Sequence, residues 1–248
     1  MSITYSVDDS VGALGIDHGP GNRIDWTFIE ELGQAAEEAA RSAARVVVIS
    51  ASGPDFSGGG HASLFADKDL KQIRSMIRGI EQAFALVESI PVPTIAAVQG
   101  RALGGGFELA LRADFILADE DARLGFPEAT VGVIPLAGGS QRLAARVGVA
   151  VATRLVLAAE EIPAIELDAA GVLVATPRGA LVDHTKTLAA RLAVGPTQAY
   201  AGTKAVLAAW TRFGLAAADE VMVDRSARLF ATEDVALAAS GSSAFVGR

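Results

Sequence analysis

"GRALGGGFELALRADFILADEDARLGFPEATVGVIP" spans residues 100–135 and joins three consecutive glycines to a glutamate surrounded by apolar residues. This glutamate, Glu108, is the only charged residue between Arg101 and Arg112. A second one, Glu128, follows twenty residues later, directly after Pro127. Burying an ionised carboxylate is costly unless partners compensate it. The pattern therefore allows two interpretations: Glu108 has a functional role, or it is a partly exposed acid in a first helical turn.

On both sides of this stretch, strand patterns alternate with helix patterns. Strands are predicted at residues 11–17, 45–51, 94–100 and 114–120. Helices are predicted at residues 24–43, 69–90 and 106–113. Asp25 is the expected N-cap of the first helix, and the prolines of "PVP" end the second. Strands that alternate with helices predict an α/β fold.

The pattern changes after about residue 185, where strand signals become few. Three successive helices are predicted at residues 185–194, 196–213 and 215–231. We therefore divide the chain into an α/β core at residues 1–185 and a helical appendage at residues 186–248. The appendage carries apolar side chains that a monomer is expected to expose in part, namely Leu188, Leu192, Val206, Leu207, Trp210 and Phe213.

Composition narrows the class of protein. The 248 residues are long enough for one large domain, or one domain with an appendage, and 51% of them are hydrophobic. A net charge of −8 without a basic run argues against a nucleic-acid surface. The chain has no cysteine, which suits a reducing compartment. It shows no secretory-signal pattern and no apolar stretch of membrane-spanning length, so the expectation is a soluble, cytoplasmic protein.

Several catalytic patterns are absent from the sequence. It contains no GxxxxGK[ST], no GxGxxG after a strand and no GxSxG, and its three histidines lack metal-ligand spacing. No metal site is therefore expected. A serine hydrolase built from dispersed residues stays open as an alternative.

Two glycine-rich turns remain, "DFSGGGHAS" at residues 55–63 and "GRALGGGFE" at residues 100–108. Each follows a predicted strand and precedes a predicted helix, where N–H groups can point at a developing negative charge. Two such turns brought together could form an oxyanion hole, and Glu108, three residues after Gly105, would face the same side of its helix. A carboxylate there suits a general base. Ordinary connecting turns, with Glu128 as an early-turn acid beside Pro127, are the alternative.

The stretches "DFSGGG", "VQGRALGGGFELALRADFILADEDARLGFPEATVGVIP", "AGGSQRL" and "GPTQAYAGTKAVL" resemble the crotonase superfamily, specifically the enoyl-CoA hydratase/isomerase family. The resemblance implies a crotonase-like spiral of β-β-α units with a C-terminal helical trimerisation region. It also implies a homo-oligomer, a trimer or a hexamer made of two trimers. The implied substrate is an acyl-CoA thioester, and no cofactor is implied beyond the CoA of that substrate.

Carried over to this chain, the resemblance implies an oxyanion hole formed by the backbone N–H groups of Gly60 and Gly105. The two catalytic acids of hydratases fall on Glu108 and Glu128. Further substrate-binding residues are expected at Gly58, Gly59, His61, Gly104, Pro135 and Leu136. The implied reaction adds water to a trans-2-enoyl-CoA, with Glu108 activating the water and Glu128 delivering a proton to the α-carbon. The two roles can be exchanged.

Two alternatives stay open: double-bond isomerisation, and CoA binding with little catalysis. Three departures from the family pattern bear on them. His61 stands where the family usually has Asp, and Leu136 where hydratases usually have glycine. The early "GPGNRID" lacks the basic residue often found before the family's "NAL". Leu136 keeps its backbone N–H but adds bulk, so it is expected either to shape the acyl pocket or to displace the water.

Overall fold

The computed structural model describes residues 2–64, 68–241 and 245–246. Its larger sheet contains, in spatial order, β1 (Ser2–Asp8), β2 (Val11–Asp17), β3 (Val46–Ala51), β4 (Thr94–Val98), β6 (Phe115–Asp119) and β9 (Val174–Thr176). Strands β1 and β2 are antiparallel, and each later neighbouring pair is parallel. Parallel neighbours need long crossover connections, which accounts for the helices between them.

A smaller sheet lies beside it and contains β5 (Arg101–Leu103), β7 (Arg123–Gly125) and β8 (Ile162–Pro163). Strands β4 and β6 of the larger sheet are each followed directly by a strand of the smaller one, β5 and β7. A helix then follows each pair, α3 (Gly105–Ala110) after β5 and the 3₁₀ helix η3 (Pro127–Val131) after β7. This repetition is the predicted succession of β-β-α units, and it places two strand-to-helix turns at the edge between the sheets.

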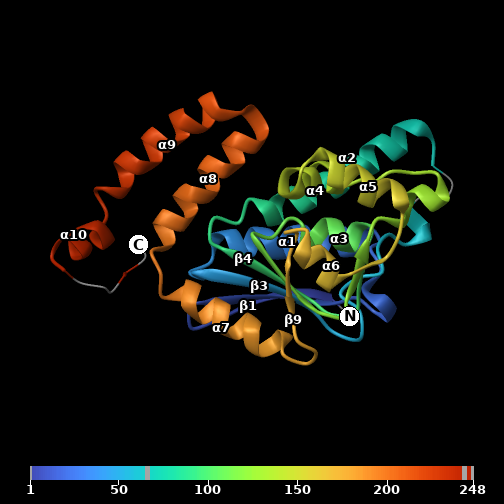
Figure 1. Ribbon diagram of the computed structural model, residues 1–248, viewed down its shortest axis with the longest axis horizontal. Helices are drawn as coiled ribbons and strands as arrows, with labels where there is room; N and C mark the ends of the chain where they lie inside the picture. Colours follow the sequence, from blue (N-terminus) through green and yellow to red (C-terminus); the bar gives the residue numbers. More distant parts are fainter. Residues whose placement is uncertain (1, 65–67, 242–244, 247–248) are drawn as a thin grey trace.

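The helices surround these sheets (Figure 1). The α-helices are α1 (Trp26–Arg41), α2 (Leu70–Glu88), α3 (Gly105–Ala110), α4 (Gly139–Val147), α5 (Val149–Ala158), α6 (Ala164–Ala169), α7 (Leu181–Ala193), α8 (Thr197–Phe213), α9 (Leu215–Leu229) and α10 (Glu233–Ala239). The 3₁₀ helices are η1 (Pro20–Asn22), η2 (Ala62–Leu64) and η3 (Pro127–Val131).

The apolar core fills both faces of the larger sheet because successive strand residues point to opposite sides. In β3, Val47 and Ile49 belong to the larger core cluster, which also contains buried residues of α1 and α2. Val46, from the same strand, packs instead with Leu181 and Leu192 of α7. A strand buried on both faces explains why residues 46–49 read as an unbroken apolar run.

The predicted α/β elements are present, with small shifts at their ends. Asp25 caps α1 as expected, its carboxylate accepting a hydrogen bond from the Phe28 N–H at 2.9 Å. The helix predicted at 106–113 ends earlier, at Ala110, because the Arg112 N–H bonds the Leu109 carbonyl, only three residues back, at 3.0 Å. The boundary predicted at residue 185 lies inside α7, which packs on the sheet.

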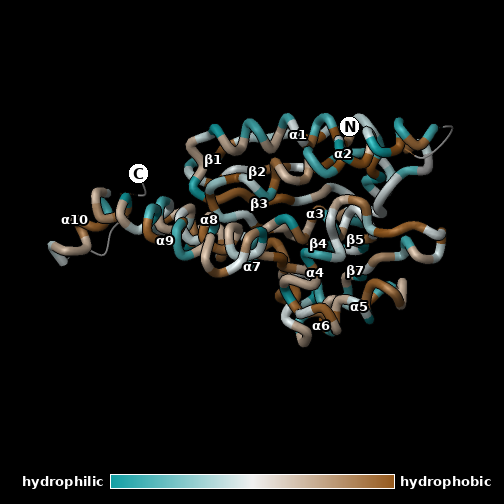
Figure 2. The backbone as a smooth tube through the Cα atoms, turned by 90° about the horizontal axis from the view of Figure 1, so that it is seen from above, coloured by the Kyte–Doolittle hydropathy of each residue, from teal (hydrophilic) through white to brown (hydrophobic). Residues whose placement is uncertain are grey.

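The C-terminal helices are arranged differently from the rest. Helices α8 and α9 pack against each other, and α9 and α10 lie outside the body in both views (Figures 1 and 2). The prediction that Leu192 would be exposed is wrong, since it is buried on the sheet, and Leu188 is half-buried beside it. Helices α8 and α9 form a helical hairpin, residues 197–230. Its exposed apolar side chains are Leu207, Trp210, Phe213, Leu215, Met222, Val223 and Phe230.

We expect this hairpin to be an assembly surface. Phe213 is 75% exposed, which is costly for a phenyl ring in water. Light scattering at micromolar concentration is expected to give three or six times the 25.4 kDa mass of the chain. Phe213→Glu is expected to shift the mass toward the monomer, while Val7→Glu, at an exposed residue of β1, serves as the control. A monomeric wild type would contradict the prediction.

Among the residues that the structure describes, no helix combines the length and apolar character needed to cross a membrane.

Candidate active site

The two glycine-rich turns lie side by side. The Ser57 N–H donates to the Arg101 carbonyl, and the Leu103 N–H donates to the Ser57 carbonyl, both at 2.9 Å. Gly59 has a φ of +80°, and a Cβ there would lie 2.5 Å from the Leu103 carbonyl oxygen and 3.6 Å from the Gly105 nitrogen. Only glycine permits this approach. The contact between turns that the sequence analysis hypothesised is therefore present.

Hydrogen bonds around Ile24 orient the peptide groups of the first turn. The Ile24 N–H donates to the Gly59 carbonyl at 2.9 Å, and the His61 N–H donates to the Ile24 carbonyl at 2.7 Å. Because the C=O and N–H of a trans peptide point in opposite directions, the Gly60 N–H points away from Ile24. No described residue accepts a hydrogen bond from it. The Gly60 N–H is therefore able to bind a ligand.

The second turn presents the N–H of Gly105, the first residue of α3. The preceding carbonyl, that of Gly104, accepts the Glu108 N–H at 2.9 Å along the helix. The Gly105 N–H consequently points outward from the helix start, where it has no partner inside the helix. Both N–H groups that the resemblance assigns to an oxyanion hole are thus unused at the junction of the two turns.

Gly104 brings Glu128 against the start of α3. Its φ is +51°, and a Cβ there would lie 2.6 Å from Glu128 Oε1. Its own N–H bonds the Gly125 carbonyl at 2.9 Å, which ties the turn to β7. The glycine is therefore required both by its backbone conformation and by the carboxyl group beside it. In this way Glu128, on η3, comes close to the helix that carries Glu108.

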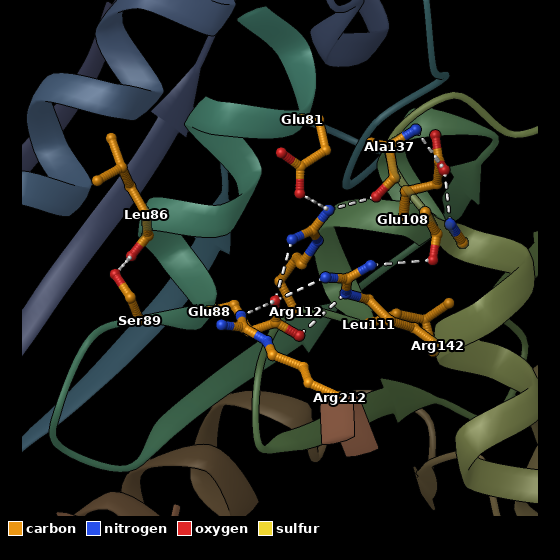
Figure 3. Close-up of polar contacts among 12 residues, drawn as sticks. Glu81, Leu86, Glu88, Ser89, Glu108, Leu111, Arg112, Ala137, Arg142 and Arg212 are labelled. Carbon is orange, nitrogen blue, oxygen red and sulfur yellow. Dashed lines mark hydrogen bonds and ion pairs between the residues drawn. The ribbon is translucent and has the colours of Figure 1, made fainter. Parts of the chain in front are cut away.

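Glu108 lies in a closed polar cage, with only 2% of its surface exposed. Its Oε1 accepts hydrogen bonds from the N–H groups of Ala137 and Gly139, both at 2.8 Å (Figure 3). Burial raises the pKa of the Glu108 carboxyl, while these N–H groups and the charge of Arg112 act to lower it. The Leu136 N–H also acts to lower this pKa, so backbone donors from residues 136–139 surround the carboxylate.

Glu128 has fewer partners. Burial, together with the charge of Glu108, raises the pKa of its carboxyl to about 7. Its Oε2 is buried and has no hydrogen-bond partner among the described residues. A carboxyl group in such surroundings holds its proton near neutral pH. Two neighbouring acids, of which one accepts more backbone hydrogen bonds than the other, can divide the roles of base and acid between them.

The other predicted site residues fall into two groups. The Gly58 N–H donates a hydrogen bond to the Gly21 carbonyl, and the Gly59 N–H donates one to Ser57 Oγ. His61 is exposed, and its Nδ1 lies 2.8 Å from Ser63 Oγ. Gly58, Gly59 and His61 thus form the first group, on the first glycine-rich turn. The second group is Pro135, which is buried, and Leu136, which is half-buried; they directly precede Ala137, whose N–H bonds Glu108.

Sequence reasoning missed the arginines around this site. Arg23 donates hydrogen bonds to the carbonyls of Gly58 and Gly60, the latter at 2.6 Å. Arg112 and Arg142 meet Glu88 of α2 on the far side of the Glu108 cage (Figure 3). Arg112 is the first charged residue after Glu108 in the sequence, but no local pattern indicated its partners. Across residues 2–64, 68–241 and 245–246, no group of three or more acidic, histidine or cysteine side chains is arranged to hold a metal.

Comparison with known proteins gives the family. The family model described as enoyl-CoA hydratase/isomerase matches residues 8–248. The chain belongs to the enoyl-CoA hydratase/isomerase family. A Bacillus subtilis family member named "Probable enoyl-CoA hydratase" is 36% identical over 197 residues, which cover 77% of this chain and 76% of that protein. The 2,3-dehydroadipyl-CoA hydratase of Escherichia coli is 36% identical over 173 residues, covering 69% of this chain and 66% of its own.

The fold agrees with that of solved members of the enoyl-CoA hydratase/isomerase family. The crystal structure of an enoyl-CoA hydratase from Bacillus anthracis superposes with a TM-score of 0.91 at 26% identity, covering 100% of both chains. The predicted crotonase-type α/β fold with C-terminal helices is therefore confirmed. That those helices mediate trimerisation stays a prediction.

Proposed function

We propose that the chain hydrates trans-2-enoyl-CoA thioesters, adding water across the 2,3 double bond. The observation that supports this most is a pair of neighbouring carboxyl groups. Glu108 lies in the first turn of α3, and Glu128, on η3, lies beside Gly104 at the start of that helix. Glu108 is held by two backbone N–H groups, and desolvation raises the pKa of Glu128 to about 7. The two N–H groups stabilise an ionised Glu108, which suits it as the proton acceptor, and the raised pKa of Glu128 suits it as the proton donor.

In the proposed reaction the thioester carbonyl accepts hydrogen bonds from the Gly60 and Gly105 N–H groups, which stabilise an enolate-like state. Glu108 takes a proton from water while the water oxygen bonds to the β-carbon. The electron pair of the double bond moves into the enolate, and protonated Glu128 then gives its proton to the α-carbon. A proton transferred from Glu108 to Glu128, directly or through solvent, restores the starting state. The net change is the addition of one water, and no cofactor is needed.

Turnover of crotonyl-CoA and longer enoyl-CoAs tests the proposal. Hydration is expected to remove the absorbance of the conjugated thioester and to increase the product mass by one water. If the chain is an isomerase, a 3-enoyl-CoA will instead gain that absorbance at unchanged mass. Tight acyl-CoA binding without turnover of either substrate would favour a binding protein with little catalysis. Either result would overturn hydration as the function.

The pH dependence tests the two roles. Because Glu128 must be protonated to donate, kcat is expected to fall as pH rises through about 7, where its raised pKa lies. Glu108 must be ionised, so kcat is also expected to fall at lower pH, giving a bell-shaped profile. Initial rates between about pH 5 and pH 9 with saturating crotonyl-CoA check this expectation. A flat profile above neutrality would contradict the role of Glu128.

Leu136 provides a test of the acyl pocket. Its backbone adopts negative φ, so glycine is not required there for conformation. Leu136→Gly is expected to widen acceptance of bulky enoyl-CoAs if the side chain shapes the pocket, and to raise the rate if it displaces water. Leu136→Ala removes the bulk without adding backbone freedom and is the matched control. If neither variant changes rate or chain-length preference, Leu136 lies outside the site.

A further inference from the structure

Arg112 is a buried cation between the candidate site and α2. It lies after the end of α3 with 3% of its surface exposed. Its Nη1 lies 3.1 Å from Glu88 Oε2, its Nη2 donates to the Ala137 carbonyl, and Glu81 Oε1 lies 3.9 Å from Nη2 (Figure 3). Removing a guanidinium from water is costly, so such a group needs close partners. Its contacts show which part of the chain it holds.

The contact with Ala137 reaches Glu108 through one residue. Ala137 offers its carbonyl to Arg112 and its N–H to Glu108 Oε1. The peptide group between Gly138 and Gly139 is bound on both sides, because Arg142 Nη1 donates to the Gly138 carbonyl at 3.2 Å while the Gly139 N–H donates to Glu108. The two arginines thus bind the carbonyl groups of the segment 137–139, while N–H groups of the same segment bind the Glu108 carboxylate.

Glu88 joins the two arginines. Arg142 Nη2 lies 2.6 Å from Glu88 Oε2, the same oxygen that Arg112 contacts. Glu88 belongs to α2 and Arg142 to α4, so the cluster connects three helical segments around the end of α3. The guanidinium of Arg112 also lies over the Phe84 ring, 5.9 Å from its centroid. These contacts fix the guanidinium in one position.

We propose that Arg112 is a positioning residue for Glu108, acting by holding the Ala137 carbonyl so that the segment 137–139 presents its N–H groups to the carboxylate. The catalytic part of the proposal rests on the proposed function, while the structural link does not. The charged groups that face Arg112 are Glu81 and Glu88 on α2, Arg142 on α4 and Glu108 on α3. Glu128 faces Glu108 from η3.

Arg112 also acts on Glu108 through its charge. The nearby cation lowers the pKa of the Glu108 carboxyl, opposing the increase caused by burial. Without that cation the pKa of Glu108 would be higher, and the ionised base would form only at higher pH. The low-pH limb of the rate profile should therefore move to higher pH. A residue that only fills space would leave this limb where it is.

The experiment compares Arg112→Met and Arg112→Lys with the control Arg146→Met. Arg146 is also partly buried and binds backbone carbonyls, those of Leu111, Ala113 and Val172. Among the described residues it forms no hydrogen bond with the segment 137–139. It therefore reports the loss of a structural arginine from the same region without the loss of the proposed link.

For Arg112→Met we expect kcat to fall by about ten-fold or more with a smaller change in KM, as misplacement of a reactive group does. The low-pH limb is expected to move upward by about one unit. Arg112→Lys keeps the charge but not the two-pronged geometry. It is expected to lose kcat while keeping the low-pH limb. Arg146→Met is expected to lower stability alone, with kcat and the limb unchanged.

Amide hydrogen exchange at Ala137 and Gly139 gives a readout that needs no activity. Exchange there is expected to be faster in both Arg112 variants and unchanged in Arg146→Met. Wild-type exchange in Arg112→Lys together with an unmoved limb in Arg112→Met would overturn the proposal. If Arg112→Met does not fold, exchange in Arg112→Lys decides. If the wild type hydrates no enoyl-CoA, the proposed function fails, and the exchange data still decide whether Arg112 holds the segment.

Discussion

Replacing Glu128 with Gln is expected to lower kcat by about 10²–10⁴-fold, the usual contribution of a general acid or base. Gln has the size of the protonated glutamate but cannot give up a proton at the pH of the reaction. Acyl-CoA binding is expected to survive, because the substitution leaves the Gly60 and Gly105 N–H groups untouched. Single-turnover rates and a binding measurement with a saturated acyl-CoA separate the two effects.

Glu108→Gln is expected to have an effect of similar size for a different reason. The amide oxygen of Gln can accept the same two N–H groups, from Ala137 and Gly139, that now bond Oε1. The cage is therefore preserved while the base is lost. Glu166→Gln, at an exposed acid in the first turn of α6, is the control and is expected to behave as the wild type. Near-normal turnover in either site variant would remove that residue from the mechanism.

The second large effect is expected from Gly105→Pro. Proline is well tolerated at the first position of a helix, so α3 should still form, but the N–H of residue 105 is lost. Losing one donor of an oxyanion hole lowers kcat by about 10²–10³-fold in the best-studied hydrolytic case. Steady-state kinetics with crotonyl-CoA measures the loss.

Gly105→Ala is the matched control for this variant. Both variants place a Cβ 2.8 Å from Ile24 Cδ1, the end of a flexible side chain, so they share that steric cost. Only the proline removes the donor. Equal activity of the two variants would show that the Gly105 N–H does not stabilise the transition state.

Local patterns in the sequence were enough to predict most of the fold. Period-2 and period-3.6 patterns located the strands and helices because each residue's face follows from its position in the element. The Asp25 cap also follows from local chemistry, because its carboxylate bonds the Phe28 N–H three residues later. Leu192 shows the limit: its apolar periodicity revealed a buried face but did not indicate whether the sheet or a neighbouring chain covers it.

The candidate site was predicted less completely. Glu108 and Glu128 stood out because an acid in an apolar run is rare, and that signal is local. The contact of Arg112 with the Ala137 carbonyl joins residues twenty-five positions apart, and no spacing rule links them. The same holds for Arg23, whose partners lie on a turn more than thirty residues away. Such contacts depend on how the elements pack, which periodicity does not determine.

Gly104 has a consequence for attempts to change the range of acyl groups that the protein accepts. Any side chain at this position would need a positive φ and would meet the Glu128 carboxyl at 2.6 Å. This side of the site therefore tolerates no redesign. Leu136 has ordinary backbone geometry and is half-buried. Libraries intended to alter chain-length preference should keep residue 104 constant and randomise residue 136. A side chain at residue 104 would displace the Glu128 carboxyl, so such a variant would lose activity whatever its chain-length preference.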